Sequence, residues 1–186
     1  MEIVSGDRKG HPLSFVSTPT LRPTSAKVRD ALFNIVAARR TLAGMRVLDL
    51  YCGVGALGLE ALSRGAAFCV FVDRGSQAIK LTKENIARLK FGDRARVIKE
   101  SAVRAVEALA EEGTTFDLVI ADPHYSIDER EVRELAASVR RVLAPDGFFV
   151  LEHSSRTSFD LEGWETAVSK RYGDTSLTFY VLEGAV

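Results

Sequence analysis

The sequence predicts an α/β fold in which a mostly parallel sheet is covered by helices on both faces. Three observations support this. Between residues 45 and 152, five short apolar segments alternate with amphipathic ones. The apolar segments contain few polar residues, as expected of strands that are buried on both faces. The chain then closes with two apolar segments joined by a short polar turn, which favours a hairpin that adds an antiparallel strand to the sheet.

Size and composition indicate one soluble globular body. The chain has 186 residues, of which 46% are hydrophobic and 27% are charged, with a formal net charge of zero. It holds no run of about 18 apolar residues, so we expect no membrane span. The first residues lack the apolar core of a secretory signal. Cys52 and Cys69 form no disulfide framework and have no metal-ligand spacing, so we expect a cytoplasmic protein without a metal.

The N-terminal part of the chain is basic and turn-rich. Glycines and prolines break residues 1–22 into short extended pieces, in which a small hairpin is favoured by Val4, Leu13, Phe15 and Val16. Thr24 or Ser25 can cap a helix that runs to about Arg39. The first forty residues hold seven basic and three acidic side chains, +4, and the rest of the chain carries −4. We therefore expect a basic extension over residues 1–40 and a catalytic domain over residues 41–186.

The remaining elements follow in order. Strands are expected at residues 45–50, 68–73, 95–99, 116–121 and 147–152, with helices at 56–64, 76–90, 102–111 and 129–143. The closing hairpin is expected from strands at 164–171 and 177–182, which brings the sheet to seven strands. His11 and His153 are expected to be surface or loop residues.

A glycine-rich loop joins the first strand to its helix. Gly53, Gly55 and Gly58 match the pattern G-x-G-x-x-G, which lets the chain turn tightly and a ligand approach the backbone. Asp73 ends the next strand about twenty residues on and can accept a hydrogen bond from a ribose diol. A tight turn that needs small residues for packing is the alternative. The order of strand, loop, helix and acid favours a nucleoside-containing cofactor.

The loop begins with an acid. Asp49, which we expect inside the mouth of the pocket, would repel a pyrophosphate but attract the ammonium and sulfonium charges of S-adenosylmethionine. A nicotinamide-binding oxidoreductase remains an alternative on the glycine pattern alone.

A second motif follows the fourth strand, where ligands bind in open parallel sheets. It reads Asp122-Pro123-His124-Tyr125. The Asp122 carboxylate and the Pro123 carbonyl can accept hydrogen bonds from an exocyclic amino group, and Tyr125 can stack on a base pulled out of its helix. An Asp-Pro pair also ends strands as a plain turn. Beside the glycine loop, the motif indicates methyl transfer to an amino nitrogen.

Several segments together resemble one known family. They are Arg22–Ser25, Val28–Ile35, the glycine loop with Ala56–Ala66, and Gly173–Thr175. The chain is similar over nearly its whole length to the RsmD family, the 16S rRNA (guanine(966)-N(2))-methyltransferases. The resemblance implies a Rossmann-like class I S-adenosylmethionine-dependent methyltransferase with a seven-stranded sheet whose last strand is antiparallel. It also implies S-adenosylhomocysteine as product and 16S rRNA in the small ribosomal subunit as the partner, with the protein acting as a monomer.

Site residues follow from these motifs and the resemblance together. The catalytic residues are expected to be Asp122, Pro123 and Tyr125. The cofactor-binding residues are expected to be Asp49, Tyr51, Cys52, Gly53, Gly55, Asp73, Arg74, Ser101 and Ala102. The RNA-binding residues are expected to be Arg22, Thr24, Lys27 and Arg29.

The chain departs from the family pattern at two positions. His124 replaces the usual second proline, which we interpret as a tolerated loop substitution rather than as a general base. Ser101 stands where an acid usually meets the adenine amino group, and its hydroxyl can still accept a hydrogen bond. Two other functions stay open: a methyltransferase for a protein amide or a small molecule, and a non-catalytic RNA-binding assembly protein with a decayed site.

Overall fold

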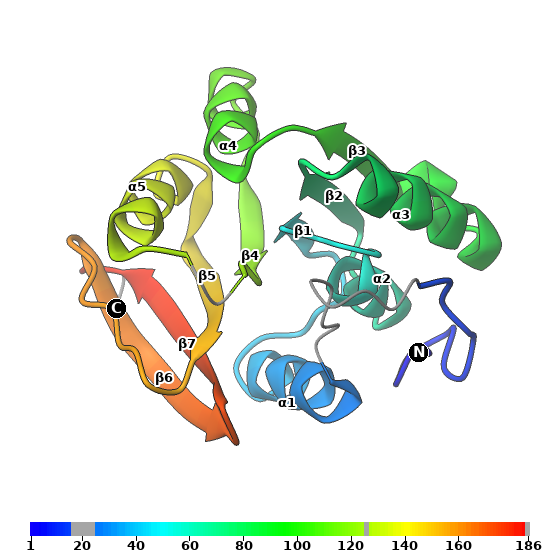
Figure 1. Ribbon diagram of the computed structural model, residues 1–186, viewed down its shortest axis with the longest axis horizontal. Coiled ribbons are helices and arrows are strands. Elements are labelled where there is room, and N and C mark those ends of the chain that lie inside the picture. The colour runs from blue at the N-terminus through cyan, green and yellow to red at the C-terminus, as the bar shows by residue number, and fades with distance from the viewer. Residues whose placement is uncertain (16–24, 125–126, 185–186) are drawn as a thin grey trace.

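A seven-stranded sheet forms the centre of the protein (Figure 1), in the order β3-β2-β1-β4-β5-β7-β6. The computed structural model describes residues 1–15, 25–124 and 127–184. The strands are β1 Arg46–Leu50, β2 Phe68–Asp73, β3 Ala95–Lys99, β4 Phe116–Ala121, β5 Leu143–Ser154, β6 Trp164–Tyr172 and β7 Thr175–Leu182. Strands β3, β2, β1, β4 and β5 are parallel, and β7 pairs antiparallel with both β5 and β6. The predicted mostly parallel sheet with an antiparallel closing strand is confirmed.

Helices lie on both faces of this sheet (Figure 1). They are α1 Ala26–Ala37, α2 Ala56–Ser63, α3 Ser76–Leu89, α4 Ala102–Glu111 and α5 Glu129–Val139, with a 3₁₀ turn at Gly92–Arg94. Two separate buried clusters lie on the two faces of the sheet. Along β2, Cys69 and Phe71 enter one cluster and Val70 and Val72 enter the other, as the period of a strand requires. Leu118 and Ile120 of β4 pack with α1, α2 and α3, whereas Val119 packs with α4 and α5. Within the described ranges, no helix is long and apolar enough to cross a membrane.

The boundary between α5 and β5 differs from the prediction. The helix ends at Val139 rather than near residue 143, and β5 begins at Leu143 rather than 147. Leu143 pairs with Phe116, and a register shift between Phe116 and Leu118 takes up the irregular start of the ladder. The closing turn is also shorter than expected. It consists of Gly173 and Asp174, and the φ of 65° at Gly173 suits a two-residue hairpin turn.

The N-terminal segment packs on the body through α2. Glu2 bridges to Pro12, and Ile3 and Leu13 are buried in the same cluster as α2. Glu60 of α2 is completely buried, and its two carboxylate oxygens accept hydrogen bonds from the amides of Val4 (2.8 Å) and Ser5 (2.9 Å). The expected hairpin therefore exists as a short return, although Phe15 is exposed and Val16 lies outside the described residues.

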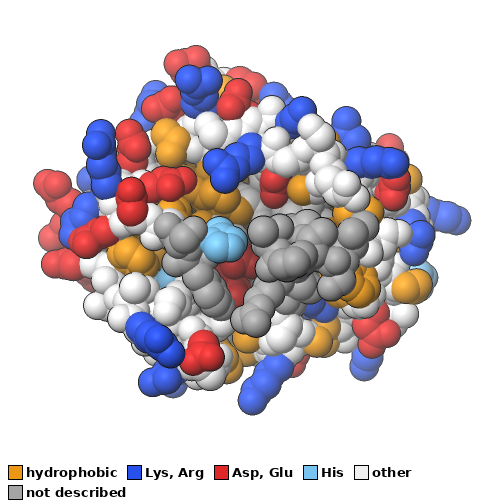
Figure 2. All heavy atoms as spheres, viewed as in Figure 1, with side chains coloured by type: hydrophobic (Ala, Val, Ile, Leu, Met, Phe, Trp, Pro, Cys, Tyr) orange, Lys and Arg blue, Asp and Glu red, His pale blue; other side chains and the backbone are white. Residues whose placement is uncertain are grey.

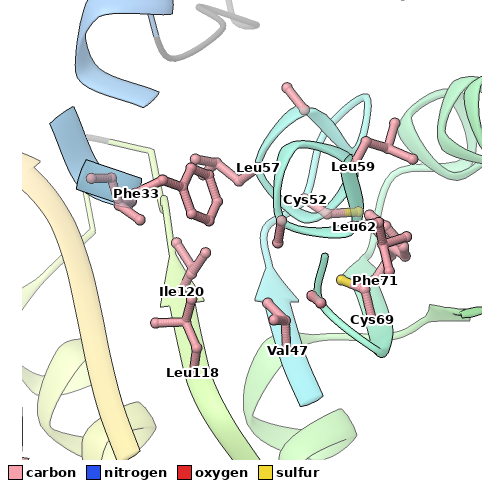
Figure 3. Packing of buried hydrophobic residues seen from close by; sticks show 14 of the residues in the cluster. Phe33, Val47, Cys52, Leu57, Leu59, Leu62, Cys69, Phe71, Leu118 and Ile120 are labelled. Carbon is pink, nitrogen blue, oxygen red and sulfur yellow. The ribbon is translucent and has the colours of Figure 1, made fainter. Parts of the chain in front are cut away.

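Helix α1 begins at the expected position. The Ser25 hydroxyl accepts a hydrogen bond from the Val28 amide at 3.3 Å, whereas Thr24 lies outside the described residues. Phe33 is fully buried, and Figure 3 shows it beside Leu57 of α2 and Ile120 of β4. Residues 1–40 thus share their core with the rest of the chain, and their division from residues 41–186 as a separate unit stays a prediction.

Candidate active site

Both sequence motifs lie at one edge of the sheet. The parallel strands β1, β2 and β4 end there at Leu50, Asp73 and Ala121. Strand β1 continues through α2 into β2 on one side and pairs with β4 on the other, so this is the point at which the strand order reverses. The Asp122 amide lies 3.4 Å from the Leu50 carbonyl oxygen. The topology therefore brings Asp122-Pro123 next to the start of the glycine loop, as predicted.

The glycine loop has an unusual backbone. Tyr51, Gly53 and Gly55 have φ values of 58°, 55° and 81°, all in the left-handed region. Glycine adopts this region easily, but a tyrosine does so rarely, and such strain concentrates at functional sites. Gly58 serves a different purpose, because an added Cβ would lie 2.3 Å from the Phe71 ring. The first two glycines shape the loop, and the third lets α2 approach β2.

Asp73 holds the loop from the neighbouring strand. Its Oδ2 accepts a hydrogen bond from the Gly53 amide at 2.9 Å, and its Oδ1 accepts one from the Gly75 amide at 2.7 Å. Each carboxylate oxygen has two lone pairs, so Asp73 retains acceptor capacity for a ribose hydroxyl. The position matches the expectation, and its cofactor-binding role stays a prediction.

Asp49 is placed differently from the prediction. We expected it inside an open pocket mouth, but it is completely buried beneath the loop, where its Oδ2 accepts a hydrogen bond from the Gly58 amide at 2.8 Å. Its Oδ1 has no hydrogen-bond partner among the described residues. Burial raises the pKa of Asp49 to about 8, and the nearby carboxylates of Asp122 and Asp73 add to the rise. Asp49 therefore supports the loop from below through the Gly58 amide, and its contact with a cofactor stays a prediction.

Two supporting residues on α3 were missed by sequence reasoning. The Thr82 hydroxyl donates to the Gly53 carbonyl at 2.9 Å. The Asn85 amide donates to the carbonyls of Val54 and Ser14, both at 3.0 Å, and its oxygen accepts from the Ser14 amide at 2.7 Å. Both side chains are completely buried. The sequence contains a pattern that could have indicated them: two polar residues, three positions apart, interrupt the apolar face of an amphipathic helix.

The other predicted cofactor residues surround this loop in different ways. Cys52 is buried with its Sγ 3.7 Å from the Thr82 hydroxyl, and burial raises the pKa of its thiol, so packing describes it better than nucleophilic chemistry. Arg74 is exposed just after β2. Ser101 precedes α4 without a side-chain capping bond, and Ala102 is buried. Their contacts with a cofactor stay predictions.

The second motif borders a hollow at the ends of β4 and β5. Asp122 is half-buried, Pro123 is buried and His124 is exposed, whereas Tyr125 lies outside the described residues. The hollow is lined by Pro123, His124, Ile127, Glu152, His153, Ser154, Thr157 and Phe159. Figure 2 shows a histidine side chain near the centre of one face of the molecule, with acidic atoms next to it. An aromatic ring, a buried carboxylate and hydroxyl groups thus meet beside the motif.

His153 corrects a prediction. It is 4% exposed in β5 instead of lying on the surface. Its Nδ1 lies 2.9 Å from the Ser154 carbonyl oxygen, which can only accept, so Nδ1 carries the proton. Its Nε2 then accepts from the Thr178 hydroxyl at 2.8 Å. Burial lowers the pKa of His153, which favours this neutral form.

The predicted RNA-binding residues differ in their exposure. Arg29 is 2% exposed and its guanidinium donates to the Glu2 carbonyl at 2.8 Å, so it joins α1 to the N-terminal segment instead of facing solvent. Desolvation lowers the pKa of Arg29, as burial does for any cation. Lys27 is exposed on α1, and Arg22 and Thr24 lie outside the described residues. The expectation that Arg29 holds a phosphate is therefore wrong for this conformation.

Neither a group of metal ligands nor a disulfide occurs among the described residues. Over residues 1–15, 25–124 and 127–184, no three histidine, cysteine or acidic side chains come together as metal ligands. Cys52 and Cys69 are both buried and unlinked.

Known proteins are similar to this chain in sequence. The sequence pattern of the family described as Conserved hypothetical protein 95 matches residues 1–181. The Bacillus subtilis protein YlbH is 35% identical over 188 residues, which cover 99% of this chain and all of that protein. Ribosomal RNA small subunit methyltransferase D of Escherichia coli K12 is 37% identical over 125 residues, or 67% of this chain and 60% of the enzyme.

Solved structures share the fold over its full extent. The yhhF protein of Escherichia coli superposes with a TM-score of 0.81 at 29% identity, covering 98% of both chains. The Thermus thermophilus protein TTHA0928 superposes with a TM-score of 0.84 at 30% identity, covering 98% of this chain and 99% of the other. The chain therefore belongs to the Conserved hypothetical protein 95 family, which is the RsmD family that the sequence motifs indicated.

Proposed function

We propose that the protein is an S-adenosylmethionine-dependent methyltransferase that modifies the exocyclic N2 of a guanine in 16S rRNA of the small ribosomal subunit, of the guanine(966) type. One observation carries the proposal: the glycine loop and Asp122-Pro123 lie next to each other at the switch point of the sheet. The Asp122 amide nitrogen is 3.4 Å from the Leu50 carbonyl oxygen. The name of the Escherichia coli relative, an rRNA small subunit methyltransferase, supports the substrate.

The residues on the glycine-loop side fit this cofactor. Asp49 lies buried beneath the loop, and its Oδ1 has no partner among the described residues. Its raised pKa would fall when a ligand with ammonium and sulfonium charges binds beside it, because a nearby cation favours the ionised carboxylate. Asp73 stands at the end of β2 with acceptor capacity for the ribose. Tyr51, Gly53 and Gly55 form the turn that brings the backbone against the ligand. S-adenosylmethionine supplies a methyl group that its sulfonium already activates.

The chain's task is then mainly to position the acceptor. The Asp122 carboxylate and the Pro123 carbonyl accept the two hydrogens of the guanine amino group and aim the nitrogen lone pair toward the glycine-loop side. Tyr125 stacks on the base once it leaves its helix. The amino group loses one proton to water as the new N–C bond forms, so no buried base is required.

Basic residues near α1 position the RNA without reading its sequence. With Arg29 buried, Lys27 together with Arg22 and Thr24 forms the proposed phosphate contact. Lys27→Glu is expected to weaken binding to small subunits and to lower the salt slope of that binding by about one. An unchanged slope would make Lys27 an ordinary solvated residue.

The function is tested with methyl-labelled S-adenosylmethionine and small subunits from a strain that lacks the gene. Label is expected in the RNA after protein and RNA are separated, and subunits from the parent strain, already modified, serve as the control. Label in protein would favour the protein-amide alternative. Binding of S-adenosylhomocysteine without any transfer would favour a decayed site. Calorimetric binding of NAD in place of S-adenosylhomocysteine would favour an oxidoreductase.

A further inference from the structure

We propose that Glu152, at the end of β5, is a specificity-determining residue that recognises guanine by accepting a hydrogen bond from its N1–H. This inference rests on the proposed function, because it assigns a role in the same acceptor site. Glu152 was not among the residues that the sequence motifs indicated. It is 5% exposed, and carboxylates are seldom buried this deeply.

The register of the sheet places Glu152 beside the catalytic motif. Ala121 of β4 pairs with Leu151 of β5 in the parallel ladder, so Asp122 and Glu152 each follow directly after a paired residue. Val150 belongs to the buried cluster on the α1–α2 face, and Glu152, two residues further, projects to that same face. Ile120 of β4 belongs to the same cluster, so Asp122, two residues further along the chain, lies on that face as well. Both carboxylates therefore come from one face of adjacent strands.

The surroundings of Glu152 combine apolar surface with polar groups. The hollow that it lines is bounded by Pro123, Ile127 and Phe159, which offer apolar surface, and by the hydroxyls of Ser154 and Thr157. Phe159 is held in place from both sides. Its carbonyl accepts from the Tyr180 hydroxyl at 3.0 Å, and its ring meets the His153 ring at 5.4 Å between centroids. An apolar wall next to a few fixed polar groups is the usual composition of a small-ligand site.

The chemistry of the base gives Glu152 its role. A carboxylate can only accept hydrogen bonds. The Watson–Crick edge of guanine donates from both N1 and N2, whereas adenine has a bare acceptor at N1. With Asp122 and Pro123 taking the N2 hydrogens, the next donor along the edge is N1–H, and Glu152 is the neighbouring carboxylate along the sheet. Adenine carries its amino group on C6 instead of C2, so transfer to adenine would have to place its N6 amino group between Asp122 and Pro123. Its N1 lone pair would then face the Glu152 carboxylate, which repels it.

The variant Glu152→Gln tests the role, because it keeps the size of the side chain and adds an N–H donor that adenine N1 can accept. Methyl transfer is measured on unmodified small subunits with guanine at the target, and on subunits whose rRNA carries adenine there. Transfer to guanine is expected to fall by about tenfold or more in kcat/KM, the loss expected for one hydrogen bond to a charged group. The guanine-to-adenine ratio of kcat/KM is expected to fall by about tenfold as well.

Controls separate recognition from folding. Affinity for S-adenosylhomocysteine and the thermal midpoint are expected to match the wild type, and Glu134→Gln, at an exposed position on α5, is expected to change nothing. Wild-type rates with an unchanged guanine-to-adenine ratio of kcat/KM would overturn the inference, as would a parallel loss of cofactor affinity.

A second variant, Glu152→Asp, is used if Glu152→Gln does not fold. We expect it to have a lower kcat/KM and to keep the guanine-to-adenine ratio. An unaltered kcat/KM would overturn the inference. A wild-type protein that transfers no methyl group would instead contradict the proposed function itself.

Discussion

The two halves of the site edge both carry acidic side chains, but they are built in different ways. At the ends of β1 and β2, backbone amides hold the carboxylates: Gly58 binds Asp49, and Gly53 and Gly75 bind Asp73. At the ends of β4 and β5, Asp122 and Glu152 stand beside a hollow with side-chain walls. The glycine-loop half is a fixed backbone turn. The half that we propose to hold the acceptor is lined by side chains that the sheet brings together.

This difference predicts that substitutions in the two halves affect different properties of the protein. A change in the glycine-loop half should weaken cofactor binding or destabilise the fold, whereas a change in the acceptor half should stop transfer and leave cofactor binding intact.

The largest effect is expected from Asp122→Ala. Removing the acceptor that orients the amino group should lower methyl transfer by at least about 100-fold, the scale of a lost orienting contact in an active site. Affinity for S-adenosylhomocysteine, measured by calorimetry on the same preparation, should stay within a few-fold. Comparable transfer in the variant would remove Asp122 from the mechanism, and an equal loss of affinity would erase the distinction between the halves.

Asp73→Ala tests the opposite half. The substitution removes the carboxylate expected to bind the ribose and also releases the amides of Gly53 and Gly75. Affinity for S-adenosylhomocysteine should fall about 10- to 100-fold, as expected for hydrogen bonds to a charged group. Asp93→Ala, the same substitution at an exposed acid in the 3₁₀ turn, is the matched control and should bind normally. Normal binding by both variants would show that Asp73 only shapes the loop.

Gly58→Ala tests the packing of α2 on β2. A Cβ there would lie 2.3 Å from Phe71 and 2.6 Å from the Cys69 Sγ, so the buried neighbours must move. Overpacking of this kind costs about 1–3 kcal/mol, and denaturant unfolding should show that loss. Gly92→Ala is the matched control, because its new Cβ meets nothing within 4 Å. Equal stability of the two variants would mean that the α2–β2 contact yields more easily than its geometry indicates.

The smallest effect concerns pH. Burial raises the pKa of Asp49 from 3.8 to about 8, so between these values the folded chain holds a proton that the unfolded chain has lost. This contribution to stability is complete below the lower pKa and is lost as pH rises through the higher one. Asp49→Asn cannot ionise, so its stability lacks this pH dependence. Between about pH 5 and about pH 7, the free energy of unfolding of the variant minus that of the wild type should therefore rise, by less than about 1.4 kcal/mol per pH unit. A constant difference would show that Asp49 is already charged in the folded protein.

The same contrast explains what the sequence could predict. Strands β2, β3 and β4 were predicted with their observed bounds, because each is a short apolar segment whose ends are marked by turn residues. The glycine loop was predicted as well, because positive φ values require glycines at fixed spacing. Both depend on local chain properties, and local patterns are visible in one sequence.

The features that were missed depend on contacts between distant residues. Arg29 looked like a surface cation on a basic helix, but its contact is Glu2, 27 residues away. Glu152 looked like the end of a strand and His153 like a surface or loop residue. Only the pairing of β5 with β4 and β7 places them beside the motif. Glu60 resembled an ordinary helix residue, yet its carboxylate binds amides 55 and 56 residues away. No periodicity in the sequence reports such partners.

The most direct test of the account is the identity of the methylated nucleoside. RNA from small subunits labelled by the wild-type protein is digested to nucleosides and separated by chromatography against standards. The account predicts that the label migrates as N2-methylguanosine, and that Asp122→Ala gives no labelled product. Label in a different nucleoside, or no label in RNA from subunits that lack the modification, would contradict it.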